Sequence, residues 1–133
     1  MRTFDLSLPL QISDVVEIAS GRCQPVLGPQ ARQRVARARS VVEAFVAEHA
    51  TPRYGINTGF GALAEVVIAD NQIAELQTNL VRSHACGVGA LLPVPVVRAM
   101  MLLRAQVLSA GHSGVRPVVI YRICELLARG AAA

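Results

Sequence analysis

The pattern of apolar and polar residues predicts a mainly α-helical chain with two short strands near its N-terminus. Residues 1–9 alternate weakly, and residues 23–27 form a second short apolar run, so both segments are predicted strands. Between them, Ser13 and Asp14 can cap a brief helix over residues 15–19 that ends at Gly21.

Four longer helices follow from apolar residues that recur with the helical period. Their predicted ranges are 30–48, 71–84, 94–109 and 115–128. Pro29 fits the permitted first turn of the first of them, and Asp70 is a suitable N-cap for the second. The third is apolar on nearly every side, which is typical of a helix at the centre of a large core.

Composition indicates that this core extends beyond one small domain. The chain has 133 residues, which fits a single domain, yet 53% of them are hydrophobic and the mean hydropathy is +0.43. A domain of this size leaves much of its surface in water. We therefore expect an obligate oligomer or a piece of a longer chain, and the helical pattern that runs almost to Ala133 favours a piece.

Charge and cysteine usage exclude several classes of function. The net charge is +4 and every basic residue is arginine, but acids are interspersed and no stacking aromatics accompany the arginines at 32–39. We expect a solvated helix face there and no nucleic-acid partner.

The three cysteines form no CxxC pair, so we expect free buried thiols in a reducing cytoplasm. The three histidines lack metal-ligand spacing, no metal is expected, and no apolar run is long enough for a membrane span.

A glycine-rich loop, Arg-Tyr-Gly-Ile-Asn-Thr-Gly-Phe-Gly at 53–61, separates two of the predicted helices. Glycines allow backbone angles that are closed to other residues, and they let a ligand approach the chain. Tyr54 is a candidate acid–base group, although a tight loop with a half-buried tyrosine explains the same residues. His84, at the end of the second long helix, is either a helix cap or a functional group.

Three blocks of sequence together resemble the N-terminal part of the aromatic amino acid ammonia-lyases. They are Tyr-Gly-Ile-Asn-Thr-Gly-Phe-Gly at 54–61, Asn-Leu-Val-Arg-Ser-His-Ala-Cys-Gly-Val-Gly at 79–89, and Ser-Gly-Val-Arg at 113–116. The Ser83-His84 pair resembles the histidine-specific members, whereas tyrosine and phenylalanine lyases tend to carry His-Leu or Phe-Leu there. Bacterial tyrosine aminomutases can also carry Ser-His.

The resemblance implies a mainly helical homotetramer that eliminates ammonia from L-histidine to give urocanate. Tyr54 matches the family's catalytic tyrosine, proposed as the base that acts on Cβ, and His84 matches a substrate-binding histidine. The residues that would support the loop are Gly55, Asn57, Gly59 and Gly61. The open alternatives are a tyrosine ammonia-lyase or aminomutase of the same family, and a non-catalytic helical interaction module.

One departure from the family pattern concerns the electrophile. The family's methylidene-imidazolone forms from an Ala-Ser-Gly that is followed by Asp-Leu-Ala-Pro and lies downstream of the blocks seen here. The chain contains only Ala19-Ser20-Gly21, near its N-terminus and followed by Arg22 and Cys23, which we interpret as a helix end. We therefore expect residues 1–133 to be an N-terminal segment without its own cofactor, inactive when isolated.

Overall fold

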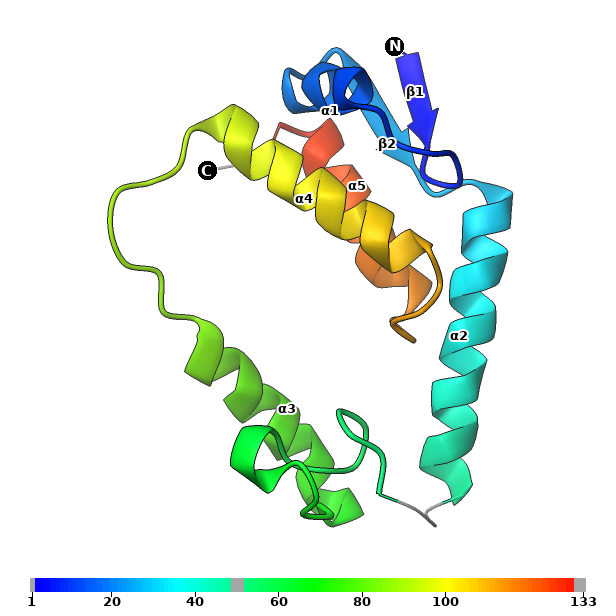
Figure 1. The fold of residues 1–133 in the computed structure, drawn as a ribbon, viewed down its shortest axis with the longest axis vertical. Helices are drawn as coiled ribbons and strands as arrows, with labels where there is room; N and C mark the ends of the chain where they lie inside the picture. Colours follow the sequence, from blue (N-terminus) through cyan, green and yellow to red (C-terminus); the bar gives the residue numbers. More distant parts are fainter. Residues whose placement is uncertain (1, 49–51, 131–133) are drawn as a thin grey trace. The chain divides into compact units, whose positions relative to one another are not determined.

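The computed structural model describes residues 2–48 and 52–130, and these residues form a mainly α-helical chain (Figure 1). In chain order the elements are β1 (Arg2–Asp5), α1 (Ile12–Ala19), β2 (Cys23–Val26), α2 (Pro29–Glu48), the 3₁₀ turn η1 (Gly61–Leu63), α3 (Asp70–His84), α4 (Val94–Ser109) and α5 (Pro117–Ala128). The predicted fold class, with helices dominant and short strands confined to the N-terminus, is confirmed.

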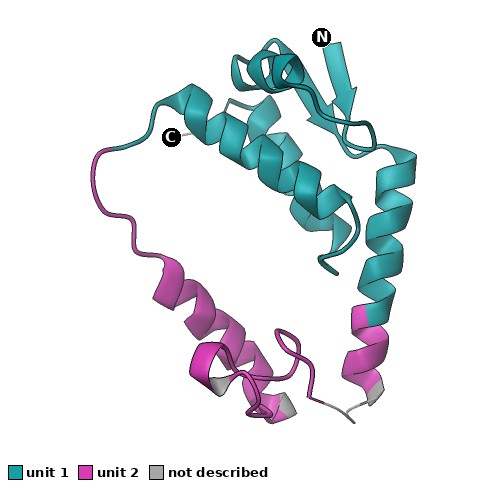
Figure 2. Ribbon diagram, in the orientation of Figure 1, with its two compact units in different colours: residues 1–41, 91–133 teal, residues 42–90 magenta. Residues whose placement is uncertain are grey.

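Two compact units divide the described chain, coloured separately in Figure 2. Unit 1 comprises residues 1–41 and 91–133, and unit 2 comprises residues 42–90. Unit 1 therefore contains the strands, α1, the start of α2, α4 and α5. Unit 2 contains the end of α2, the glycine-rich loop and α3.

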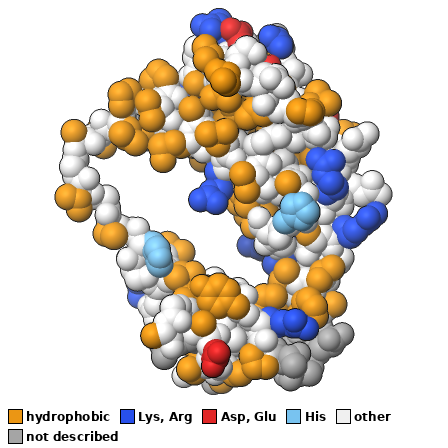
Figure 3. Space-filling model, in the orientation of Figure 1, with side chains coloured by type: hydrophobic (Ala, Val, Ile, Leu, Met, Phe, Trp, Pro, Cys, Tyr) orange, Lys and Arg blue, Asp and Glu red, His pale blue; other side chains and the backbone are white. Residues whose placement is uncertain are grey.

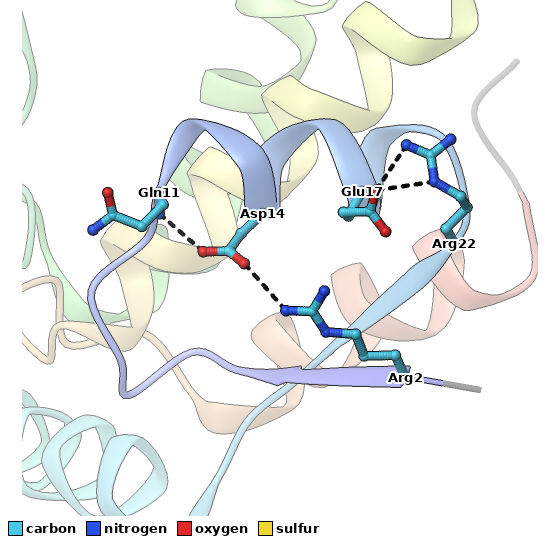
Figure 4. Close-up of polar contacts among 5 residues, drawn as sticks. All are labelled: Arg2, Gln11, Asp14, Glu17 and Arg22. Atoms are coloured by element: carbon cyan, nitrogen blue, oxygen red, sulfur yellow. Dashed lines mark hydrogen bonds and ion pairs between the residues drawn. The ribbon is translucent and has the colours of Figure 1, made fainter.

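A small β–α–β unit begins unit 1. β1 and β2 pair in parallel, with Phe4 opposite Pro25, and α1 connects them. Polar contacts hold the connection together (Figure 4): Arg22 donates to Glu17 at 3.0 and 2.8 Å from Nε and Nη2, and Arg2 lies 3.7 Å from Asp14. The hydrogen bonds from Arg22 lower the pKa of Glu17 below its usual value.

The first turn of α1 differs from the sequence prediction. The helix begins at Ile12, three residues before the predicted start, so Ser13 and Asp14 lie inside it and do not cap it. The Asp14 carboxylate instead accepts a hydrogen bond from the backbone N–H of Gln11 at 3.1 Å. A carboxylate in the first turn can satisfy a free backbone N–H just as a capping residue does. Asp14 therefore correctly indicated a helix, but the prediction placed the start of that helix three residues too late. In α3, similarly, Asp70 is the first helical residue and Ala69 the cap.

The core of unit 1 forms where α1, α4 and α5 pack on β2 and the start of α2. Its fully buried large side chains include Leu6, Ile18, Leu102, Ile120 and Leu127. Ser109 joins α4 to the N-terminal segment, because its hydroxyl contacts the Leu6 carbonyl at 3.1 Å.

The apolar helix α4 is not buried on every side within the described residues. Its face with Leu102, Ala105 and Leu108 is buried, whereas Met100 and Val107 are 56% and 60% exposed. Figure 3 shows hydrophobic side chains gathered along this part of unit 1. Within residues 2–48 and 52–130, α4 thus lies at the surface of its unit and not at the centre. A larger assembly that covers its outer face remains a prediction.

Two further expectations concern the cysteines and membrane insertion. Cys23 and Cys124 are buried free thiols as expected, but Cys86 is exposed, so the expectation of burial is wrong for it. Cys86 follows the end of α3, within a run of exposed residues over 81–96. Among the described residues, no helix is both long and apolar enough to cross a membrane.

Candidate active site

The loop that carries Tyr54 is closed by its own hydrogen bonds. The side-chain oxygen of Asn57 accepts from the backbone N–H of Arg53 at 2.7 Å. In return, the Arg53 carbonyl accepts from the N–H groups of Ile56 and Asn57 at 3.0 and 3.2 Å. The amide of Asn57 therefore fixes the turn around Tyr54, which gives a physical role to a residue predicted to support the loop.

A short antiparallel contact anchors the second half of the loop. Thr58 bridges Val67, and the flanking N–H of Gly59 donates to the Val66 carbonyl at 3.0 Å. Ile68 N–H donates to the Asn57 carbonyl at 2.9 Å. Thr58 is 1% exposed, so this junction is buried although the loop itself lies at the surface. Residues 66–68, which have no clear sequence pattern, thus hold the loop through an isolated β-bridge and its two flanking hydrogen bonds.

Gly55 and Gly61 adopt left-handed backbone conformations, with φ of +76° and +58°. A Cβ atom added at either position would meet nothing within 4 Å. The requirement for glycine at these positions is therefore conformational, because side chains with a Cβ rarely adopt such angles.

Tyr54 projects from this loop and is 68% exposed, more than the half-buried tyrosine of the plain interpretation. Its ring packs edge-on against Phe60, with the centroids 5.9 Å apart and the planes at 74°. The neighbouring Arg53 guanidinium lies 4.6 Å from the centre of the Phe45 ring, a cation–π contact. The loop thus contacts the tyrosine ring through Phe60 and leaves most of the side chain accessible.

His84 is the last residue of α3 and is exposed. Its Nδ1 atom lies 2.9 Å from the Leu80 carbonyl oxygen and 3.0 Å from the Ser83 hydroxyl. The Ser83 hydroxyl itself donates to the Leu80 carbonyl at 2.8 Å. Tyr54 and His84 both belong to unit 2, so the structure places the two predicted site residues in one compact unit.

The geometry of Ala19-Ser20-Gly21 does not fit a methylidene-imidazolone precursor. Closing a five-membered imidazolone ring requires the Gly21 nitrogen to attack the Ala19 carbonyl carbon. That nitrogen instead donates to the Ile18 carbonyl at 3.1 Å, and the Ala19 carbonyl accepts from Arg98 at 2.9 Å. These three residues therefore form an ordinary helix end, in agreement with the sequence interpretation.

Arg98 is a buried charge that the sequence analysis does not single out. It is 6% exposed, and its guanidinium donates to Ile18 and Ala19 at the end of α1 and to Leu127 at the end of α5. It borders an open pocket of about 550 Å³ between these helix ends. The negative ends of two helix dipoles face one cation there, so we assign Arg98 a structural role.

Metal ligation finds no support among the described residues. No group of three or more His, Cys, Asp or Glu side chains there is arranged so that it could hold a metal ion.

Comparison with known proteins places these features in context. The family model described as aromatic amino acid lyase matches residues 10–133. A histidine ammonia-lyase of Sorangium cellulosum is 53% identical over 127 residues, covering 93% of this chain and 24% of that protein. A histidine ammonia-lyase of Deinococcus radiodurans is 48% identical over 122 residues, covering 92% of this chain and 23% of that protein.

Solved structures of related enzymes share the fold. A tyrosine aminomutase from Streptomyces globisporus superposes with a TM-score of 0.87 at 32% identity, over 96% of this chain and 24% of its own. A histidine ammonia-lyase from Trypanosoma cruzi gives a TM-score of 0.83 at 32% identity, with the same coverage. The chain thus spans about a quarter of the length of these relatives.

Proposed function

We propose, from the premise that this chain belongs to the aromatic amino acid lyase family, that it is the N-terminal segment of a histidine ammonia-lyase. The reaction would be the non-oxidative elimination of ammonia from L-histidine to give urocanate. The observation that carries the proposal is the self-closed loop, which exposes Tyr54 in the same unit as His84. The names of the relatives at 53% and 48% identity support histidine as the substrate.

Tyr54 would act as the base that removes a proton from Cβ of the substrate. That proton is barely acidic, so the base must be both accurately placed and sufficiently ionised. The Asn57 turn and the Phe60 edge contact supply the placement. A free phenol, with a pKa of about 10, is largely protonated at neutral pH, and nearby positive charge favours the phenolate.

His84 would bind the substrate side chain or its carboxylate from the end of α3. In the family, methylidene-imidazolone supplies the electrophile for the reaction. We propose that it forms from an Ala-Ser-Gly downstream of residue 133, because Ala19-Ser20-Gly21 is committed to a helix end.

Replacement of Tyr54 by phenylalanine in the complete protein tests the role of the base. Tyr54→Phe keeps the ring and its contact with Phe60, so only the hydroxyl is lost. We expect kcat for urocanate formation to fall about 10²- to 10⁴-fold, the usual contribution of a general base. Tyr121→Phe is the matched control, since Tyr121 is 41% exposed on α5 in unit 1, and it should retain wild-type turnover. Equal activity of the two variants would remove Tyr54 from the mechanism.

A second candidate is an aminomutase, which re-adds ammonia at Cβ. The similarity to the Streptomyces globisporus tyrosine aminomutase supports it, as does the Ser83-His84 pair. Incubation with histidine, tyrosine and phenylalanine separately distinguishes the two. Urocanate from histidine alone supports the lyase, whereas a β-amino acid from tyrosine supports the aminomutase.

We also propose that residues 1–133 alone lack lyase activity and that the complete protein is a cytoplasmic homotetramer. The commitment of Ala19-Ser20-Gly21 to a helix end supports the first proposal. The exposed apolar face of α4 supports the oligomer, and the three free thiols support the reducing compartment. Light scattering on the complete protein measures the oligomer directly. Urocanate formation by the isolated chain would contradict the first proposal. The non-catalytic interaction module would be indicated instead if the 133-residue chain binds partner helices and the complete protein shows no turnover.

A further inference from the structure

The turn that carries Tyr54 is anchored at its C-terminal end. Thr58 forms an antiparallel bridge with Val67, and the N–H of Ile68 donates to the Asn57 carbonyl at 2.9 Å. Thr58 is 1% exposed, so this anchor is buried, whereas Tyr54 itself is largely exposed. A turn that is held at one end alone can swing about that end. The position of Tyr54 therefore depends on what holds the N-terminal end of the turn.

Arg53 supplies a contact at that N-terminal end. Its guanidinium carbon lies 4.6 Å from the centroid of the Phe45 ring, which belongs to α2. A guanidinium at this distance over the face of a ring is attracted by the ring quadrupole. The backbone of Arg53 is part of the turn, because its N–H donates to the Asn57 side chain at 2.7 Å and its carbonyl accepts from the Ile56 N–H at 3.0 Å. One residue thus connects α2 to the hydrogen-bonded turn around Tyr54.

We propose that Arg53 is a positioning residue for the base, and that its contact with Phe45 fixes Tyr54 relative to α2. This inference rests on the proposed function for the role of Tyr54. Phe45 and the turn both belong to unit 2, so the contact lies within one compact unit. Loss of the guanidinium would leave the turn closed by Asn57 but free to swing about its C-terminal anchor.

Two single variants separate positioning from a simple effect of charge. Positive charge near a phenol favours the phenolate, so a cation beside Tyr54 could also act on its pKa. Phe45→Leu removes the aromatic face and keeps the charge of Arg53, whereas Arg53→Gln removes the charge and keeps a polar side chain. Positioning predicts that both variants impair the base to a similar extent. A charge effect predicts impairment by Arg53→Gln alone.

Nuclear magnetic resonance of the 133-residue chain tests the contact without any need for turnover. Protons of the Arg53 side chain should show an upfield ring-current shift, because they lie over the face of the Phe45 ring, and Phe45→Leu should abolish that shift. ¹⁵N relaxation of the Gly55 and Asn57 amides should report motion of larger amplitude in both variants than in the wild type. Arg53→Lys, which keeps a cation, should retain most of the wild-type rigidity.

The matched control is Arg37→Gln. Arg37 is an exposed arginine on the part of α2 that belongs to unit 1, and its loss should leave the ring-current shift and the relaxation of the turn unchanged. A wild-type chain without the ring-current shift, or a Phe45→Leu chain whose turn is as rigid as the wild type, would overturn the proposal.

Kinetics of the complete protein provide the functional readout. Arg53→Gln and Phe45→Leu should each lower kcat for urocanate formation about 2- to 5-fold, the range that an exposed cation–π contact supplies, and leave KM within about twofold. The double variant should be no slower than either single variant, because both substitutions remove the same contact. The pH dependence of kcat should keep its wild-type midpoint in all three.

The kinetic outcomes distinguish this inference from the proposed function. If the wild type fails to turn over histidine, the proposed function fails, while the anchor itself is decided by the relaxation data. If Arg53→Gln shifts the pH midpoint and Phe45→Leu behaves as the wild type, Arg53 acts through its charge. The positioning role is then wrong although the proposed function holds.

Discussion

Arg98 provides the sharpest test of how this chain is held together. Its guanidinium makes hydrogen bonds of 2.9, 3.0 and 2.9 Å to the carbonyls of Ala19, Ile18 and Leu127. These carbonyls lie at the C-terminal ends of α1 and α5, so one side chain on α4 joins three helices. Methionine at position 98 has a side chain of comparable length but no donor.

The expected magnitude follows from the burial of the site. A hydrogen bond that involves a charged group contributes about 1.5–3 kcal/mol, and a buried group left without a partner costs about 1–3 kcal/mol. Three contacts that share one guanidinium are not additive, so we expect Arg98→Met to lower the free energy of unfolding by more than one such bond and less than three, about 3–5 kcal/mol. The stability loss of Arg98→Lys should lie between zero and that of Arg98→Met. Lysine keeps the positive charge, but its compact ammonium lacks the planar fork with which the guanidinium reaches carbonyls on two helices.

Urea unfolding followed by far-UV circular dichroism measures the effect. Arg104→Met is the matched control, because Arg104 is an exposed arginine on the same helix. We expect the control to stay within about 0.5 kcal/mol of the wild type, as is usual for surface substitutions. A loss below about 1 kcal/mol for Arg98→Met, or a loss equal to that of the control, would refute the assignment of Arg98 as the link between the helix ends.

Three further predictions concern packing and thiol chemistry. Gly28→Ala would place a Cβ 1.9 Å from the Asp5 carboxylate, so we expect about 1–3 kcal/mol of destabilisation in urea unfolding, while Gly87→Ala, with open space around it, should cost less. Cys86 should react with an alkylating reagent in the native chain, and the two buried cysteines only after unfolding; mass spectrometry of the labelled peptides decides this. Burial raises the pKa of Cys124 to about 11 from an ordinary value of 9.0. The thiol therefore ionises at a lower pH in the unfolded chain than in the folded chain. The contribution of Cys124 to the free energy of unfolding should be lost as pH rises from about 9 to about 11, and Cys124→Ala should reduce that loss.

The positions of the helices could be predicted closely because local signals agree along the chain. The range 94–109 coincides with α4, since Pro93 and Pro95 define its start and the apolar residues recur at helical spacing. The start of α1 was misplaced because Asp14 satisfies a free backbone N–H from inside the first turn. Periodicity identifies a helix, but the residue that begins it depends on which group reaches the free amides.

The candidate site was predictable in its residue types and less so in its geometry. The sequence singles out Tyr54, Asn57 and His84, and the structure supplies what each contacts. The bridge between Thr58 and Val67 could not be predicted, because the segment that pairs with the loop has no strand pattern of its own. The roles of Tyr54 and His84 in catalysis stay predictions until the variants are measured.

By itself the sequence determined the helical class, the element order and the family, because these depend on residue spacing and on short blocks that are contiguous in the chain. Only the tertiary structure decided that Arg98 is buried and which helix ends it joins, since those carbonyls lie 79, 80 and 29 residues away. It also decided that α4 exposes one apolar face and that Nδ1 of His84 lies within hydrogen-bond distance of the Leu80 carbonyl and the Ser83 hydroxyl. Burial and hydrogen-bond partners are properties of packing in space, and a one-dimensional pattern does not specify them.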